Sequence, residues 1–352
     1  VKADTVTVKS QWSHWINEIM AKTILAIDMG TTNTRIYKKN VGVVLCEPTM
    51  LCVTENLGKT EIVAFGLNAK KMQGKTNEDL EFVSPIMGGI IASLKLAESL
   101  LEYFVQKVLE SGEKFDIVFT VPCGLKEEEI LNFKNLGYTL GAGKVYLVPS
   151  VLTALMGAGE NLNKASGVLS LNLGGGTIDM AICSLNQILK GYSIFFGGNK
   201  IDEAIKLYVN QFLDMQISNQ TAEKLKIEAG SLFLHDLTNC EFSGVDINTK
   251  SPKTEVVDAS SLRDTLEFYF QKVYMAIKVM INSASPDIVS DLSINGIIVT
   301  GGLANLTGLE NYLSKNLNLP VQICDDAFNA VVLGAGKLIA DEEYLKKVVN
   351  LT

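Results

Sequence analysis

Two segments decide the fold: Leu25-Ala-Ile-Asp-Met-Gly-Thr-Thr-Asn-Thr-Arg-Ile-Tyr37 and Leu169-Ser-Leu-Asn-Leu-Gly-Gly-Gly-Thr-Ile-Asp-Met180. In each segment an apolar run leads into a polar, glycine-containing turn, and a second apolar run follows, which is the pattern of a β-hairpin. The two hairpins have similar lengths and polarity. An internal duplication is the economical explanation, and it predicts a chain with two similar halves.

Both turns have a composition that suits phosphate binding. Phosphate oxygens need several convergent backbone N–H groups, and Gly and Thr let the chain approach them closely. A third turn, Gly301-Gly302, follows an expected strand at 296–300 and is expected to open a helix at about Leu306. One such turn is weak evidence, because ordinary tight turns share this composition. Three turns in this arrangement are more specific, and the absence of GxxxxGK[ST] and GxGxxG motifs argues against P-loop and dinucleotide-binding folds.

Apolar runs and helix breakers predict the elements around these turns. Helices are expected at 94–109 and 126–136, and a buried strand at 115–121 ends at Pro122. The hairpin strands are expected at 23–27, 35–38, 168–173 and 178–184. Strands and helices interspersed in this way indicate an α/β chain.

Composition excludes several classes of function. The 352 residues are 47% hydrophobic, enough for two or three lobes with large cores. The net charge of −8, without runs of like charge, argues against a nucleic-acid partner. The six cysteines show no CxxC spacing and are expected to be buried, reduced thiols of a cytoplasmic protein. With only two histidines, the sequence is poorly supplied for a His-based catalytic triad or a His-rich metal site. No secretory signal and no apolar run of about 18 residues is present.

Residues 1–20 are expected to be an extension or an expression remnant, because Met20 stands directly before the first strand, where a translation start is expected. Trp12, Trp15, Ile16 and Ile19 have the spacing of one apolar helix face. Two interpretations stay open: an interfacial membrane anchor or partner helix, and a helix that packs on its own domain or is only a tag. Few basic residues on the polar face favour the second. Any contact with the membrane is therefore expected only through this helix.

Seven segments in chain order resemble the signatures of the MreB family, bacterial actin homologues of the actin, sugar-kinase and heat-shock-ATPase superfamily. These segments are Ile27-Asp-Met-Gly-Thr-Thr-Asn-Thr34, Val121-Pro-Cys-Gly124, Leu173-Gly-Gly-Gly-Thr-Ile-Asp179, Phe196-Gly-Gly-Asn-Lys-Ile-Asp-Glu-Ala-Ile205, Thr221-Ala-Glu-Lys-Leu-Lys-Ile-Glu228, Ile298-Val-Thr-Gly-Gly302 and Leu333-Gly-Ala-Gly-Lys337. The resemblance covers essentially everything after Met20.

The resemblance implies an actin-like α/β fold. Two similar domains, each a mixed sheet flanked by helices (a duplicated ribonuclease-H-like fold), are expected to hold ATP or ADP and Mg²⁺ in the cleft between them. Domain I is expected at 21–165 plus 325–352, with a small insertion at about 53–82. Domain II is expected at 166–324, with an insertion at about 199–262.

The resemblance also implies the site residues. Asp28 would lie near the metal and its waters. The other nucleotide-binding positions are Gly30, Thr31, Thr32, Asn33, Gly174, Gly175, Gly176 and Thr177 at the phosphates, Gly197, Gly198 and Asp202 near the ribose, Glu223 and Lys226 at the sugar and base, and Gly301, Gly302 and Leu303 at the adenine. Leu303 stands where the family has a third glycine. Without the motif, a solvated surface pair is the favoured explanation of Glu223 and Lys226.

The sequence departs from the family at the hydrolytic centre. The acid that positions the attacking water falls on Ser150, and the metal-organising acid before the second turn is replaced by Asn172. Loss of a general base costs typically 10²–10⁴-fold in rate. Thr177 and Asp179 are the remaining polar groups that could place a water, so slow ATP hydrolysis is predicted.

These features predict a filament-forming cytoskeletal protein of cell shape or motility. It would assemble with itself and with paralogous filament proteins, in the cytoplasm or at the inner face of the membrane. The altered centre suggests a specialised paralogue, like those of wall-less helical bacteria. A small-molecule kinase of the same superfamily and a nucleotide-sensing membrane adaptor are the alternatives. A heat-shock-type chaperone is disfavoured because no peptide-binding domain follows, and a membrane loop is disfavoured because 110–114 is a short charged turn.

Overall fold

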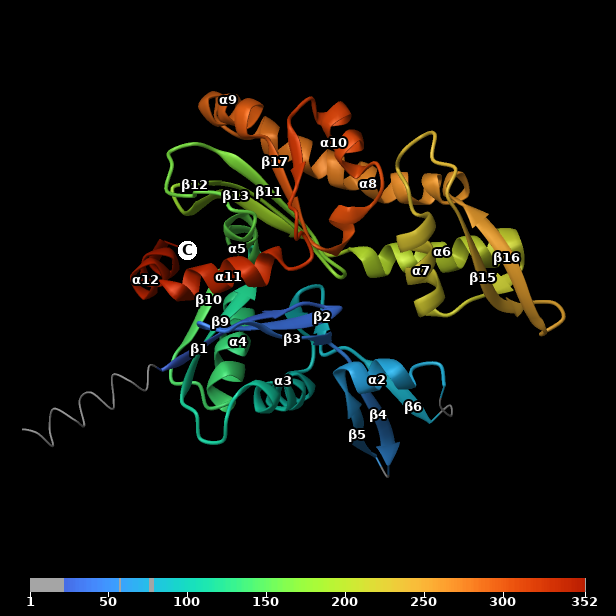
Figure 1. The fold of residues 1–352 in the computed structure, drawn as a ribbon, viewed down its shortest axis with the longest axis horizontal. Helices are drawn as coiled ribbons and strands as arrows, with labels where there is room; N and C mark the ends of the chain where they lie inside the picture. The colour runs from blue at the N-terminus through green and yellow to red at the C-terminus, as the bar shows by residue number, and fades with distance from the viewer. Residues whose placement is uncertain (1–21, 57, 76–78, 352) are drawn as a thin grey trace, which may run out of the picture.

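The computed structural model describes residues 22–56, 58–75 and 79–351. Two five-stranded sheets form its framework (Figure 1). Sheet I has the order β10-β9-β1-β2-β3, with β1 Thr23–Met29, β2 Asn33–Lys38, β3 Gly42–Pro48, β9 Phe115–Val121 and β10 Val145–Pro149. Sheet II has the order β13-β12-β11-β17-β18, with β11 Val168–Leu173, β12 Ile178–Ser184, β13 Gln187–Ile194, β17 Ile297–Thr300 and β18 Val321–Ile323.

The two sheets have the same topology. In each sheet the first three strands in sequence form an antiparallel meander. The first strand also pairs in parallel with the fourth, and the fourth pairs in parallel with the fifth. The predicted internal duplication is therefore confirmed. The predicted hairpin strands, the strand at 115–121 and the helices at 94–109 and 126–136 are confirmed too, the helices as α3 (Leu94–Val108) and α4 (Glu127–Thr139).

Two helices lie between the sheets (Figure 1): α5 (Ser150–Gly157) and α11 (Ala330–Ala340). Their apolar side chains join residues of both sheets, including Ala26, Val118 and Ala181, in one buried cluster. The helices cross so closely that a Cβ at Gly334 would lie 1.7 Å from the Thr153 carbonyl oxygen. This crossing is the packed floor beneath the cleft.

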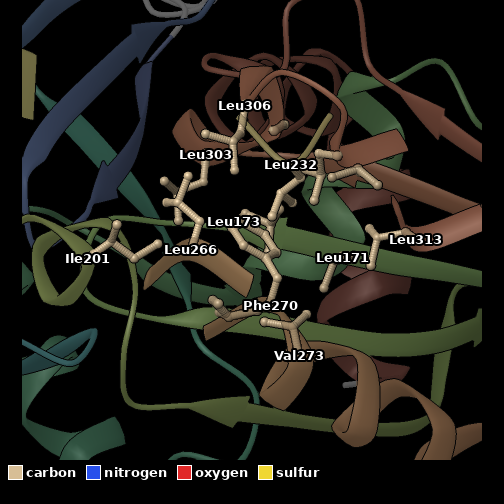
Figure 2. Close-up of a cluster of buried hydrophobic side chains, with 14 of the residues drawn as sticks. Leu171, Leu173, Ile201, Leu232, Leu266, Phe270, Val273, Leu303, Leu306 and Leu313 are labelled. Carbon is tan, nitrogen blue, oxygen red and sulfur yellow. The ribbon is translucent and has the colours of Figure 1, made fainter. Parts of the chain in front are cut away.

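A separate core covers the outer face of each sheet. Helices α3 and α4 pack on sheet I. Sheet II is covered by α8 (Ala259–Asn282), α9 (Pro286–Asn295) and α10 (Leu309–Leu317). Figure 2 shows Leu303 and Leu306 in the same cluster as Leu171 and Leu173 of β11. Their burial anchors the turn after β17 to sheet II.

Two smaller units extend to one side of the framework (Figure 1). The first contains β4 (Leu51–Asn56), β5 (Lys59–Phe65), β6 (Leu80–Val83) and α2 (Gly66–Met72). The second contains α6 (Gly198–Leu213), α7 (Asn219–Ala229), β14 (Met215–Gln216), β15 (Asn239–Asp246) and β16 (Pro252–Asp258). They lie at the predicted insertions, while the exact division of the chain into domains stays a prediction. The hairpin of β7 (Ile86–Met87) and β8 (Ile90–Ile91) leads back to sheet I, and α12 (Glu342–Leu351) follows α11.

One expected element is wrong. The turn Gly301-Gly302 opens a short 3₁₀ helix, η1 (Gly302–Asn305), and the α-helix begins only at Leu309. Thr307 forms an isolated bridge with Ser231, and Gly308 has a φ of 80°. Because that left-handed conformation interrupts helical geometry, the helix cannot start at Leu306.

The predicted apolar helix around Trp12 lies outside the described residues. Within them, no helix has both the length and the apolar character that a bilayer span requires.

Candidate functional site

A cavity of about 350 Å³ lies between the two sheets and the two smaller units. Its size is within the range of about 300–1,000 Å³ that is typical of small-molecule sites. Three turns line it: the first turn at 30–33, the second at 174–177 and the third at 301–303. All three follow strands that end at the same edge of the framework, so the duplicated topology itself brings them together.

The first and second turns have the same hydrogen bond. The Gly30 amide donates to the Asn33 carbonyl at 3.1 Å, and the Gly174 amide donates to the Thr177 carbonyl at 2.9 Å. In each turn the amide donates to the carbonyl three residues ahead. The two hairpins also occupy equivalent positions in their sheets. The equivalence that the sequence suggested therefore extends to backbone geometry.

The two turns also face each other at contact distance. A Cβ at Gly175 would lie 2.0 Å from Thr32 Oγ1, and a Cβ at Gly176 would lie 2.2 Å from Thr31 Oγ1. Only glycine fits at these two positions while the lobes stand this close. Thr32 Oγ1 also donates to Asn199 Oδ1 at 3.1 Å, which joins the first turn to the start of α6.

A charged pair lies below the first turn. Arg35 Nη1 donates to Asp28 Oδ2 at 3.1 Å, and Thr120 Oγ1 donates to Asp28 Oδ1 at 3.0 Å. The Arg35 guanidinium carbon lies 3.9 Å from the centre of the Phe328 ring, a cation–π contact. Arg35 Nε is buried and has no hydrogen-bond partner.

The equivalent position in sheet II has no positively charged side chain. Thr300 Oγ1 donates to Asn172 Oδ1 at 3.3 Å, and Asp179 stands opposite Asn172 on β12. Burial raises the pKa of Asp179, against the lowering effect of hydrogen bonds from Ser193, Ser150 and Thr177. Ser150 Oγ and Thr177 Oγ1 each donate to Asp179 Oδ2 at 3.3 Å. Ser150, at the position where the resemblance led us to expect an acid, therefore carries a hydroxyl bonded to Asp179.

These residues fit a tightly held Mg²⁺ poorly. Magnesium favours oxygen ligands and contacts protein through one or two carboxylates, often by way of its waters. Both oxygens of Asp28 are engaged by Arg35 and Thr120, and Asn172 supplies an amide in place of a charge. Within the described part of the chain, no group of three His, Cys, Asp or Glu side chains is arranged for a metal.

The opposite end of the cavity holds a buried ion pair. Lys226 Nζ lies 2.8 Å from Asp202 Oδ1 and donates to the Gly198 carbonyl at 3.2 Å. Burial raises the pKa of Asp202, and the charge of Lys226 opposes this shift. Glu223 instead meets Lys70 of α2, with Nζ and Oε2 3.4 Å apart across the mouth of the cavity. Glu223 and Lys226 thus share a helix face, but each has a partner elsewhere.

The cavity gathers nearly all the site residues expected from the sequence. Those that line it are Asp28, Gly30, Thr31, Thr32, Asn33, Ser150, Asn172, Gly174, Gly175, Gly176, Thr177, Asp179, Gly198, Glu223, Lys226, Gly301, Gly302 and Leu303. Gly197 and Asp202 stand behind this lining, Gly197 against the Gly174 carbonyl and Asp202 behind Lys226.

Sequence reasoning missed other lining residues, among them Arg35, Thr120, Asn199, Ile227 and Phe328. A signal for Arg35 was present, because strand periodicity puts it on the same face as Asn33. Phe328 carried no local signal, since it lies in the connection after β18 and reaches the cavity through tertiary packing.

Comparison with known proteins identifies the family. The model of the MreB/Mbl protein family matches residues 22–347. The cell shape-determining protein MreB of Escherichia coli K12 is 30% identical over 321 residues, which cover 90% of this chain and 92% of that protein. The cell shape-determining protein Mbl of Bacillus subtilis 168 is 30% identical over 327 residues, 92% of this chain and 97% of that protein.

Solved structures agree with this assignment. MreB5 of Spiroplasma citri bound to AMPPNP superimposes with a TM-score of 0.87 at 29% identity, covering 94% of this chain and 98% of that one. The MamK double helical filament superimposes with a TM-score of 0.76 at 16% identity, over 91% of this chain and 99% of that one, which supports the fold alone. The chain belongs to the MreB/Mbl family and is an actin-like cytoskeletal protein.

Proposed function

We propose that this protein binds ATP and ADP in the cleft, assembles into filaments and acts in cell shape or motility. One observation carries the proposal: two equivalent glycine- and threonine-rich turns, one from each half, face each other across a cavity of about 350 Å³. Converging backbone N–H groups from two such turns suit the β- and γ-phosphates. The relative from Spiroplasma citri, which binds AMPPNP and ADP, supports the same assignment.

The remaining residues suit a nucleoside. Gly198, Lys226 and Glu223 would hold the ribose and base, with Asp202 fixing the Lys226 ammonium. Leu303 and Ile227 offer apolar surface on which an adenine ring can pack. Magnesium would enter with the nucleotide and be held mainly by its phosphates, with only a weak contribution from Asp28, whose oxygens are engaged by Arg35 and Thr120.

ATP hydrolysis in this cleft should be slow. Phosphoryl transfer depends on positioning the nucleophile and stabilising charge. Ser150 and Asn172 supply no carboxylate, and Asp179 is 3% exposed and already accepts hydroxyl donors on both oxygens. We assign Thr177 and Asp179 the role of placing a slow attacking water, because both line the cavity at the second turn and are hydrogen-bonded to each other.

Self-assembly and location are part of the proposal. A head-to-tail contact that does not close produces a filament, and the named MreB and Mbl relatives determine cell shape. Paralogous filament proteins are proposed as further partners. A cytoplasmic location agrees with six cysteines that are all free thiols. Contact with the inner membrane face would depend on the segment around Trp12, which lies outside the described residues.

Nucleotide binding and assembly can be tested separately. Calorimetry with ATP, ADP and GTP should detect binding of adenine nucleotides, and a bound ligand should also raise the melting temperature. Sedimentation and negative-stain images should then show filaments with nucleotide present. Compact monomers under all nucleotide and salt conditions would contradict assembly and favour the kinase or adaptor alternatives. No binding of any nucleotide would contradict the proposal as a whole.

A further inference from the structure

Arg35 is a buried cation at the phosphate end of the cavity. Its side chain is about one-tenth exposed, and it lines the cavity directly below the first turn. Among the described lining residues the other cation is Lys226, which lies at the ribose end and is paired with Asp202 as Arg35 is paired with Asp28. Burying a guanidinium is costly unless it is paired and hydrogen-bonded. Asp28 is the acidic partner of Arg35, through Nη1.

We propose that Arg35 is a built-in phosphate ligand that takes over part of the charge neutralisation otherwise supplied by Mg²⁺, so that nucleotide binding depends only weakly on magnesium. This inference rests on the proposed nucleotide function. It adds a specificity-determining residue to the site. It also predicts a weaker requirement for Mg²⁺ than the sequence led us to expect.

The position of Arg35 is set by strand register. Asp28 and Arg35 are directly opposed in the antiparallel pair β1–β2, and Arg35 comes two residues after Asn33, the last residue of the first turn. Side chains two apart on a strand share a face. The guanidinium thus lies on the floor of the same turn that we assign to the phosphates.

Two contacts hold the guanidinium in place before any ligand binds. Asp28 accepts from Nη1, and the Phe328 ring supports one face of the plane at 3.9 Å. A planar guanidinium has five N–H donors, of which one carboxylate contact uses a minority. The remaining donors suit phosphate oxygens, and hydrogen bonds between charged groups are about twice as strong as those between neutral groups.

The same contacts reduce the contribution of the protein to Mg²⁺ binding. A water on the metal would have to compete with Arg35 and Thr120 for the oxygens of Asp28. Asn172, at the equivalent position of sheet II, offers no charge. The cleft therefore has a neutral amide at one of two equivalent strand ends and a fixed cation beside the acid at the other.

The test measures ADP and ATP affinity in excess Mg²⁺ and in excess EDTA. The variants are Arg35→Gln, Arg35→Lys and, as a matched control, Lys38→Gln. Lys38 lies on the same strand and also forms an ion pair, with Glu113, but does not line the cavity. For the unaltered protein, removal of Mg²⁺ should weaken binding by less than about threefold. For Arg35→Gln the loss on Mg²⁺ removal should reach about tenfold or more, since a charge-assisted contact is missing.

Arg35→Lys keeps the charge without the planar donors and should fall between the two. Circular dichroism and the melting temperature without nucleotide establish that each variant is folded. If the unaltered protein loses its affinity in EDTA as fully as Arg35→Gln does, the inference is wrong while the proposed function stands. An equal effect of Lys38→Gln would also overturn the inference, because loss of any positive charge from this strand would then explain the result. Absence of binding in both buffers would overturn the proposed function together with the inference.

Discussion

Asp28 and Asn172 occupy the same place in the two halves of the molecule. Asp28 faces Arg35 on β2 and Thr120 on β9, and Asn172 faces Asp179 on β12 and Thr300 on β17. In both halves the threonine hydroxyl donates to the side chain on the first strand, at 3.0 Å and 3.3 Å. The duplication has kept this hydrogen bond while the charges around it have diverged, with a cation in one half and an acid in the other.

The contact between the two turns predicts a steric penalty. Gly175→Ala would put a Cβ 2.0 Å from Thr32 Oγ1, so the lobes must separate at the phosphate end. Overpacking of this kind costs about 1–3 kcal/mol, and nucleotide affinity should fall by about tenfold. Calorimetry checks the affinity. Adding Thr32→Ala removes the clashing hydroxyl and should recover part of the loss; a double variant as weak as Gly175→Ala alone would show that the contact is not the cause.

The ion pair across the cavity mouth predicts a kinetic effect. Lys70 of α2 and Glu223 of α7 lie 3.4 Å apart, and Gln220 also donates to the Lys70 carbonyl. Both charged groups are partly exposed, so Lys70→Ala should change stability by at most about 1 kcal/mol. Nucleotide release, followed by stopped-flow fluorescence, should accelerate several-fold because the smaller units separate more readily. Lys71→Ala, a neighbouring lysine, is the control, and equal release rates in the two variants would contradict a role for this pair.

The burial of Asp179 predicts a pH-dependent stability. Because the pKa of Asp179 is raised in the folded protein, its folded state keeps a proton that the unfolded chain releases near pH 4. Above that pH the folded state binds more protons than the unfolded state, so this residue's contribution to stability falls as pH rises through the raised pKa. Asp179→Asn should therefore raise the melting temperature near neutral pH and leave it unchanged near pH 4. A uniform shift at both pH values would instead indicate an effect of packing.

The hairpins of the fold were predictable because their signals are local, whereas most of the site residues were expected only from the resemblance to the MreB family. Two apolar runs around a glycine-rich turn predicted each hairpin, and the repeat of that pattern predicted the duplication. Arg35 could have been identified from the strand period after Asn33. Phe328 could not, because only the packing of the β18–α11 connection brings it over Arg35. The helix expected at Leu306 failed for a similar reason: the bridge between Thr307 and Ser231 joins segments far apart in the sequence.

The close crossing of α5 and α11 predicts a large loss of stability. A Cβ at Gly334 would lie 1.7 Å from the Thr153 carbonyl oxygen, and the contact is between backbones that cannot give way. Gly334→Ala should lower the free energy of unfolding by about 3 kcal/mol, at the upper end of overpacking effects. Denaturant unfolding measures this. Ser99→Ala at a partly exposed position of α3 should stay within about 0.5 kcal/mol, and a similar value for Gly334→Ala would contradict this account of the crossing.

The hydrogen bond from Ser150 to Asp179 predicts how hydrolysis can be restored. Ser150→Glu supplies a carboxylate at the start of α5, and Asn172→Asp returns a charge to the end of β11. Together they should raise single-turnover phosphate release by about 10²-fold, since a general base contributes typically 10²–10⁴-fold. The two effects should couple because both act on one water.

The same hydrogen bond sets a cost for this change. Ser150 Oγ lies 3.3 Å from Asp179 Oδ2, so Ser150→Glu brings a second carboxylate against a buried acid and should lower the melting temperature. Asp179→Asn in the same background should recover that stability. Ser99→Glu, which adds a charge at a partly exposed position of α3, controls for net charge, and nucleotide affinity is measured in parallel. If the unaltered protein already releases phosphate as fast as the double variant, the centre is not disabled, and Thr177 with Asp179 must place the water efficiently.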